Sequence, residues 1–120
     1  MSHKLLPIQY VLIITDNVAG WPLGAIVAQG CHAVTACMAK FRELPEYQEY
    51  IADENIGQMR KALLACPLAK WSEIKSRLVT EKVNFIEWYE QPENVLTSVA
   101  LVPGSKRLLK PVISELALLS

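Results

Sequence analysis

Two polar side chains, Gln29 and His32, interrupt the run of small and apolar residues from Gly24 to Ala33, G-A-I-V-A-Q-G-C-H-A. They are three residues apart, so on a helix they project from the same side. An imidazole is a candidate general acid or base, although a helical histidine without a neighbouring acid often serves only as a hydrogen-bonded structural group. Close packing on a sheet explains the small residues, and the uncharged side around Gln29 and His32 indicates a surface that is covered or that lines a cleft.

Three carboxylates, Glu87, Glu90 and Glu93, lie within seven residues of one another further along the chain. Paired carboxylates can perform acid–base chemistry. Glu90 stands where a predicted strand enters a loop, a position from which a carboxylate can face a ligand, whereas Glu87 fits a charge on a strand surface. A solvated acidic loop explains the same residues equally well.

Cysteine chemistry fits the sequence less well. Cys31 and His32 are neighbours, and neighbouring helical residues point about 100° apart, so they do not form a compact thiol–imidazole pair. The 3 cysteines include no C-x-x-C motif, and the 2 histidines do not cluster with them as zinc ligands. Reduced thiols and no metal site are therefore expected.

The elements that must position these residues follow from the hydrophobic pattern. A short, nearly continuous apolar run at 8–15 predicts a central strand that is covered on both faces. Apolar residues three and four apart predict a helix at 23–41, and the predicted core-facing residues are Leu23, Ile26, Val27, Gly30, Val34, Cys37, Met38 and Phe41. The other predicted elements are a short acidic surface helix within 43–54, strands at 59–65, 83–89 and 95–102, an amphipathic helix at 68–79, and a terminal helix with Pro111 near its start and with Leu116 and Leu119 inside it.

This order of elements predicts an α/β fold for a single domain over residues 1–120. We expect a three-layer α/β/α arrangement around a mixed sheet of about four strands, because a hairpin follows the alternating strands and helices. In such sheets, sites form at strand ends and in the loops that follow them. The first such place is the loop at 15–24, which leads into the helix of Gln29 and His32.

Composition limits the partners. The chain has 120 residues, of which 52% are hydrophobic and 20% are charged, and its formal net charge is zero. It is long enough for one folded domain, and any contact with RNA must come from a local basic patch. The uncharged run at 17–39 raises the alternative of a membrane span, but its glycines, proline and histidine favour a helix of a folded domain. The N-terminus does not fit a secretory signal, so we expect a cytoplasmic protein and no membrane partner.

Three ordered motifs resemble the type II peptidyl-tRNA hydrolase family. The segment A-x-x-A-Q-x-x-H-A at 25–33 follows a first strand and a glycine-containing turn, as it does in that family. The wider segment W-P-x-G-A-x-V-A-Q-x-C-H-A at 21–33, G-x-M-R-K at 57–61 and W-x-E-Q-P-E-N at 88–94 are most similar to the eukaryotic branch of peptidyl-tRNA hydrolase domain-containing proteins. The resemblance spans roughly residues 8–118.

The resemblance implies a mixed sheet between helices and hydrolysis of the ester that joins a peptide to the 3′ ribose of tRNA, without a cofactor. It further implies that Gln29 and His32 orient a water molecule or the ribose end. Glu90 would act as a base or orienting group, and Asn94 would donate a hydrogen bond to the developing oxyanion.

The chain also departs from the main branch of that family. Enzymes of that branch carry two lysines in a G-K-G-K turn, where this chain has Leu23 and Ala25, and their D-A-G-x-T loop aligns its Asp and Thr with Glu90 and Asn94. Losing a cation that stabilises developing charge typically costs orders of magnitude in rate. Two hypotheses follow, an esterase acting on peptidyl-tRNA and a catalytically impaired tRNA- or protein-binding module. A small-molecule hydrolase on the same scaffold has no sequence feature of its own.

A basic segment near the C-terminus is the strongest candidate for RNA contact. Residues 104–110 contain three cations and no acid. They predict weak, salt-dependent tRNA binding through Lys106, Arg107 and Lys110, with Arg60 and Lys61 as further contacts. A solvated basic surface explains the same residues. The oligomeric state, monomer or homodimer, stays open.

Overall fold

Strand β1 (Ile8–Ile14) forms the centre of the protein, and all seven of its residues are buried. The computed structural model describes residues 7–120, apart from the side chain of Leu108. Within this range the strands form one five-stranded sheet in the order β3-β4-β1-β2-β5. β1 therefore has a neighbour on each side, as the continuous apolar run at 8–15 predicts.

The sheet is mixed. β1 is parallel to β2 (Arg60–Cys66) and antiparallel to β4 (Val95–Leu101). The edge strands, β3 (Phe85–Glu90) and β5 (Ala117–Leu118), are antiparallel to β4 and β2 respectively. The predicted α/β fold with a mixed sheet is confirmed, and β5 adds a fifth strand to the four predicted ones. Its two residues are too short to leave a periodic signal in the sequence.

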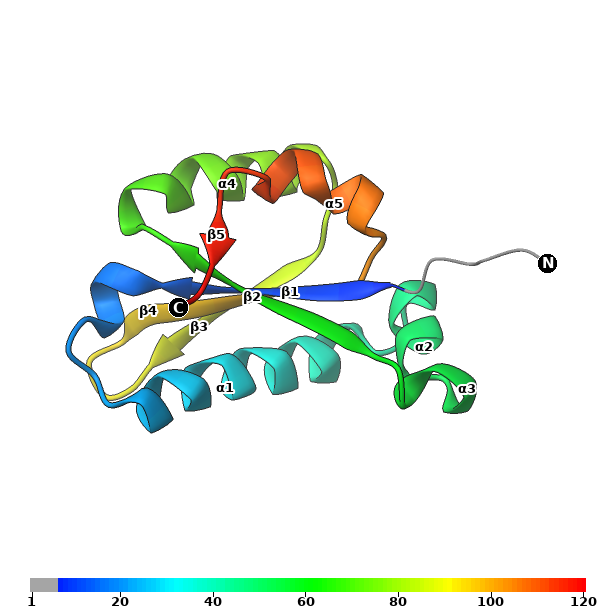
Figure 1. Ribbon diagram of the computed structural model, residues 1–120, viewed down its shortest axis with the longest axis horizontal. Helices are drawn as coiled ribbons and strands as arrows, with labels where there is room; N and C mark the ends of the chain where they lie inside the picture. The colour runs from blue at the N-terminus through cyan, green and yellow to red at the C-terminus, as the bar shows by residue number, and fades with distance from the viewer. Residues whose placement is uncertain (1–6) are drawn as a thin grey trace.

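Helices cover both faces of the sheet (Figure 1). One long helix, α1 (Leu23–Phe41), lies on one face and packs over β3, β4 and β1. The other face carries α4 (Leu68–Thr80) and α5 (Lys106–Ile113). The remaining elements are a 3-10 turn, η1 (Thr15–Val18), and two short helices at one end of the sheet, α2 (Pro45–Ile51) and α3 (Asp53–Ile56).

The buried side of α1 agrees with the predicted one only in part, because Gly30 and Cys37 are buried as predicted but other residues are not. Leu23 and Val27, which the pattern placed toward the core, are 76% and 50% exposed, and Met38 is exposed as well. Gln29 and Ala33 are buried against the sheet instead. The helix is thus turned so that its small residues face the sheet, which lets the backbone approach closely.

Two other predictions need correction. The terminal helix begins at Lys106 and ends at Ile113, so Pro111 lies inside α5 and Leu116 lies beyond it. Leu109, Val112 and Ile113 anchor that helix in the core, after which the chain leaves to form β5. The acidic segment at 43–54 forms two helices, and its Tyr47 and Tyr50 are buried, with Tyr47 accepting a 2.8 Å hydrogen bond from Gln9 of β1.

Within residues 7–120, no helix is long and apolar enough to cross a membrane.

The centre of β1 predicts a large stability difference between two chemically identical changes. Leu12 is fully buried, so Leu12→Ala is expected to lower the free energy of unfolding by about 2–5 kcal/mol through lost apolar burial and a cavity. Leu23→Ala, at a side chain that is 76% exposed, should change it by less than about 0.5 kcal/mol. Urea denaturation measures both, and equal losses would contradict the observed orientation of α1.

Candidate active site

The contact between α1 and β4 is centred on Gln29, whose side chain is only 2% exposed. The Thr97 hydroxyl donates a 2.6 Å hydrogen bond to Gln29 Oε1, and the Ser98 hydroxyl donates a 2.8 Å bond to the Gln29 backbone carbonyl. Thr97 and Ser98 are themselves buried. Buried polar atoms need such partners, so this group of hydrogen bonds fixes how α1 sits on the strand.

A β-bulge makes this arrangement possible. Trp88 of β3 lies opposite Ser98, whereas the next residue, Tyr89, lies opposite Leu96, so Thr97 is the extra residue on β4. In an unbroken strand, successive side chains point to opposite faces. The bulge lets Thr97 and Ser98 both reach Gln29 on the α1 face. Bulges commonly re-aim side chains in this way beside active sites.

His32 lies three residues beyond Gln29 on α1, and its side chain is exposed. Its ring stacks on the indole of Trp88, with 4.9 Å between ring centroids and 26° between the ring planes. Trp88 is half-buried and reaches toward α1 from β3. The pairing holds the imidazole at the edge of the helix, where a ligand can reach it.

Glu90 forms a row of side chains with His32 and Trp88. Trp88 Nε1 donates a hydrogen bond of 3.2 Å to Glu90 Oε1, so the recorded path from His32 to the carboxylate runs through the indole. Glu90 is half-buried and is the last residue of β3. The structure therefore gathers Gln29, His32 and Glu90 on one side of α1, together with a tryptophan that links the last two.

Glu87 belongs to the opposite face of the sheet. Its carboxylate accepts hydrogen bonds from Trp71 Nε1 at 3.1 Å and from Lys75 Nζ at 2.9 Å. The bond to Glu87 raises the pKa of Lys75, so this ammonium stays charged at neutral pH. Glu87 is thereby a structural partner of α4. Of these two carboxylates, Glu90 is the one on the α1 face of the sheet.

Asn94 lies at the tip of the β3–β4 hairpin and has a φ of 59°, in the left-handed region that asparagine tolerates better than most residues. Its Oδ1 accepts a hydrogen bond of 2.8 Å from Gln91 Nε2 within the same turn. The Asn94 side chain is thus hydrogen-bonded within its own loop, and the structure does not place it in contact with Gln29 or His32.

The hairpin is tied to the loop that follows β1. Asn17 Nδ2 of η1 donates a 2.8 Å hydrogen bond to the backbone carbonyl of Leu96. The hairpin tip, η1 and the first turn of α1 consequently lie at the same end of the molecule (Figure 1). Glu90 ends its strand there, next to the strand-end loop in which the sequence pattern predicts a site.

The sequence matches a model of the family described as "Peptidyl-tRNA hydrolase PTH2" over residues 8–119. The chain belongs to this family. It is also similar to the human and mouse proteins named "Putative peptidyl-tRNA hydrolase PTRHD1". Each is 35% identical over 103 residues, which cover 82% of this chain and 72% of the relative. The resemblance that the motifs indicate is confirmed.

The PTH2 motif residues explain part of the site but not all of it. Trp88, Thr97 and Ser98 join Gln29, His32 and Glu90 in the structure, and no pattern in the chain had marked the two hydroxyl residues. Two adjacent hydroxyl residues inside an otherwise apolar strand were the available signal, because one of them would face the core in a regular strand. Among residues 7–120, no three His, Cys, Asp or Glu side chains lie together as metal ligands.

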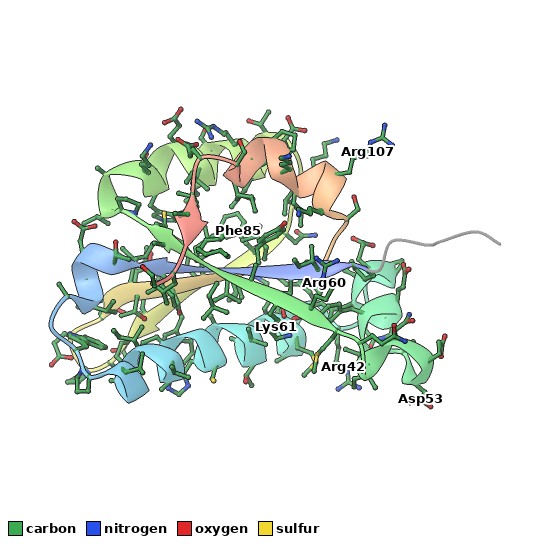
Figure 2. The ribbon with its side chains drawn as sticks, in the orientation of Figure 1. Arg42, Asp53, Arg60, Lys61, Phe85 and Arg107 are labelled. Carbon is green, nitrogen blue, oxygen red and sulfur yellow. The ribbon has the colours of Figure 1, made fainter. Side chains whose placement is uncertain are left out.

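The cations predicted to bind RNA lie away from this PTH2 site. Lys106, Arg107 and Lys110 are on α5, across the sheet from α1, and Arg60 lies opposite Ile8 at the far end of β1. Figure 2 shows Arg60 and Arg107 toward the end where α2 and α3 pack. A seven-residue strand spans about 20 Å, so that end is well separated from Glu90. Lys61 is on the α1 side, where its ammonium donates a 3.0 Å hydrogen bond to Tyr50 Oη.

Thr97 gives a direct test of the contact that builds the site. Thr97→Val keeps the shape of the side chain but leaves Gln29 Oε1 buried without its donor, so the free energy of unfolding should fall by about 1–3 kcal/mol. Thr80→Val, at an exposed position of α4, is the matched control and should change it by less than about 0.5 kcal/mol. Equal effects in urea denaturation would mean that the buried bond contributes nothing.

Proposed function

We propose that this protein is a peptidyl-tRNA hydrolase, which cleaves the ester between a peptide and the 3′ ribose of tRNA with an activated water. The observation that carries the proposal is the row of His32, Trp88 and Glu90 beside the strand-end loop of a chain that belongs to the PTH2 family. The names of the human and mouse relatives point to the same reaction.

In this proposal Glu90 holds the attacking water and takes its proton as the water oxygen bonds to the ester carbonyl carbon. The carbonyl electrons return as the bond to the ribose oxygen breaks. The ribose oxygen takes up a proton, either from the His32 imidazolium or from a water that His32 orients. The products are a free peptide carboxylate and a tRNA with an intact terminal hydroxyl. An acceptor at Glu90 and a donor at His32 are the two groups that this balance requires.

Two further residues have supporting roles in the proposal. Gln29 is too deeply buried to meet a substrate, so it acts as a positioning residue that fixes α1 and the Thr97–Ser98 segment. Asn94 would serve as the oxyanion donor through its amide nitrogen, since its oxygen is engaged by Gln91. The aromatic stack of His32 and Trp88 offers a flat surface for the terminal base of the acceptor end, because stacking on aromatic side chains suits any base.

One observation favours a second candidate, a tRNA- or protein-binding module that has lost the reaction. The first turn of α1 carries Leu23, which is 76% exposed, and Ala25, where main-branch enzymes carry lysines. No basic or acidic residue occurs in that turn. A site without a nearby cation must stabilise the oxyanion with hydrogen-bond donors alone.

Substitution of the acid–base pair separates the two candidates. Glu90→Gln should abolish most deacylation because it removes a charge with little change of shape, and His32→Ala should slow the reaction by about 10²-fold. Single-turnover deacylation of an N-blocked aminoacyl-tRNA measures both rates. Glu93→Gln in the exposed hairpin loop is the control and should leave the rate unchanged.

The outcomes of this assay are distinct. A wild-type rate at background, with tRNA still bound, supports the binding module and rejects the enzyme. Full activity in Glu90→Gln shows that a different carboxylate serves as the base.

The basic surface of α5 predicts how tRNA binding responds to salt. We propose that Lys106 and Lys110 contact phosphates, so the double change to Ala should weaken binding and reduce the slope of log affinity against log salt by about 2. Lys40→Ala with Arg42→Ala, at the C-terminal end of α1, removes the same charge elsewhere and should leave the slope unchanged. Titration of tRNA at several salt concentrations measures the slope. Salt-independent affinity, or equal effects of the two doubles, would reject the α5 surface.

A further inference from the structure

An apolar groove runs along the flank of α1 that faces β2. α1 packs chiefly over β3, β4 and β1, and α2 reaches the start of β2, where Tyr50 Oη donates a hydrogen bond to the Arg60 carbonyl. Between these contacts, Leu63 in the middle of β2 is only half-buried. The hollow between α1 and β2 has a volume of about 370 Å³, and its walls are made by Val27 and Val34 of α1 and by Val11 and Leu63 of the sheet. Gly30 lies on the floor, where a Cβ atom would stand 3.8 Å from both Leu63 and Val11. This flank is opposite the one on which His32 meets Trp88.

The groove exposes aliphatic surface to solvent. Val27 is 50% exposed, and Gly30 adds no side chain to fill the hollow. Apolar hollows with few polar groups are the common form of small-ligand sites, and this volume is at the lower end of their range. The hydrolase proposal makes no use of this surface.

A single cation lines the groove. Lys61 Nζ donates a 3.0 Å hydrogen bond to Tyr50 Oη and lies 4.8 Å from the centre of the Tyr50 ring. Within the part of the chain that the structure describes, no carboxylate pairs with this ammonium. Burial lowers the pKa of Lys61, with a smaller opposing contribution from Cys37. The Lys61 side chain is exposed, so its ammonium can meet an anion whose apolar body lies in the groove.

The length of the groove indicates the length of ligand that fits it. The helical positions that line the groove run from Val27 to Thr35, a rise of about 12 Å at about 1.5 Å per residue. An extended chain of about eight to ten carbons, with C–C bonds of about 1.5 Å, has a similar length. A stable protein interface needs about 800 Å² on each partner, far more than one such hollow supplies.

We propose that this groove binds a medium-chain aliphatic carboxylate, with the carboxylate on Lys61 and the alkyl chain against Val27, Val34 and Leu63. The hydrocarbon leaves water along the exposed aliphatic wall, and the carboxylate gives Lys61 a charged partner in addition to Tyr50 Oη. The site is independent of the proposed ester chemistry, because its residues lie on the other flank of α1.

Cys31 supplies a built-in reporter for the test. Cys31 lines the groove and is exposed, whereas Cys37 and Cys66 are buried. Burial raises the pKa of each of the buried thiols to about 11, so both react slowly at neutral pH. The rate at which neutral iodoacetamide alkylates the folded protein therefore reports on Cys31.

Decanoate, kept below its micelle concentration, should slow alkylation of Cys31 in a saturable way. Lys61→Met should require about tenfold more decanoate for the same protection, the value of one charge-assisted hydrogen bond, while Lys61→Arg should retain it. The uncharged analogue decanol should protect the wild type and Lys61→Met equally. Lys40→Met, which removes a lysine of α1 outside the groove, is the matched control and should bind decanoate as the wild type does.

A second variant addresses the apolar wall. Val27→Asp, at a half-exposed position, should weaken both decanoate and decanol without unfolding the protein. Absence of protection by decanoate, or equal protection in wild type and Lys61→Met, would overturn the proposal. Protection that appears without ligand and grows with protein concentration, together with a dimer in sedimentation, would also overturn it and assign the groove to a second copy of the chain. None of these readouts depends on deacylation activity.

Discussion

The hydrogen bonds that Gln29 receives from Thr97 and Ser98 fix the position of α1 on the sheet, and the rest of the candidate site depends on that position. The helix can approach this closely because Gly30 and Ala33 face the sheet with little or no side chain. The Gln29 amide at this contact needs hydrogen-bond partners, because leaving a buried polar group unpaired costs more free energy than one hydrogen bond contributes. The bulge on β4 supplies two hydroxyls where a regular strand would supply one. Three residues further along α1, His32 is thereby placed over Trp88.

The width of the sheet explains why the two flanks of α1 differ. A helix is about 10 Å wide, whereas five strands about 4.8 Å apart span nearly twice that distance. On the opposite face, α4 and α5 share the sheet, whereas α1 shares its face with the short helix α2, whose Tyr47 and Tyr50 pack in one cluster with Ala33 and Cys37 at one end of the sheet (Figure 1). Because Gln29 holds α1 over β4, the middle of β2 is left only half-buried on this face, at Leu63. Polar and aromatic side chains consequently gather on one flank of the helix, and aliphatic surface stays open on the other.

Much of the fold follows from local pattern. The buried run of β1 and the 3.6-residue period of α1 predict both elements almost to the residue, and the motif at 25–33 predicts which helix carries Gln29 and His32. The orientation of α1 was predicted only in part, because a hydrophobic period assumes that the largest apolar residues are the buried ones. Here small residues and an amide occupy the contact. Two adjacent hydroxyl residues make Thr97 and Ser98 stand out in an apolar strand, but their joint contact with Gln29 could not be predicted, because a bulge is a relation between two strands and leaves no period in either. The clustering of Trp88 with His32 likewise requires knowing how β3 lies beside α1.

Electrostatic attraction of phosphate and stabilisation of an oxyanion act over different distances. A cation on α5 can attract phosphate across several ångströms, since screening at physiological salt sets in at about 8 Å. Stabilisation of an oxyanion requires a donor at about 3 Å. Separated from Glu90 by the sheet, Lys106 and Lys110 cannot replace a lysine in the first turn of α1, where Leu23 and Ala25 stand. In the proposed function, affinity for RNA and the rate of ester cleavage therefore depend on different surfaces of the same fold, so either can be lost without the other.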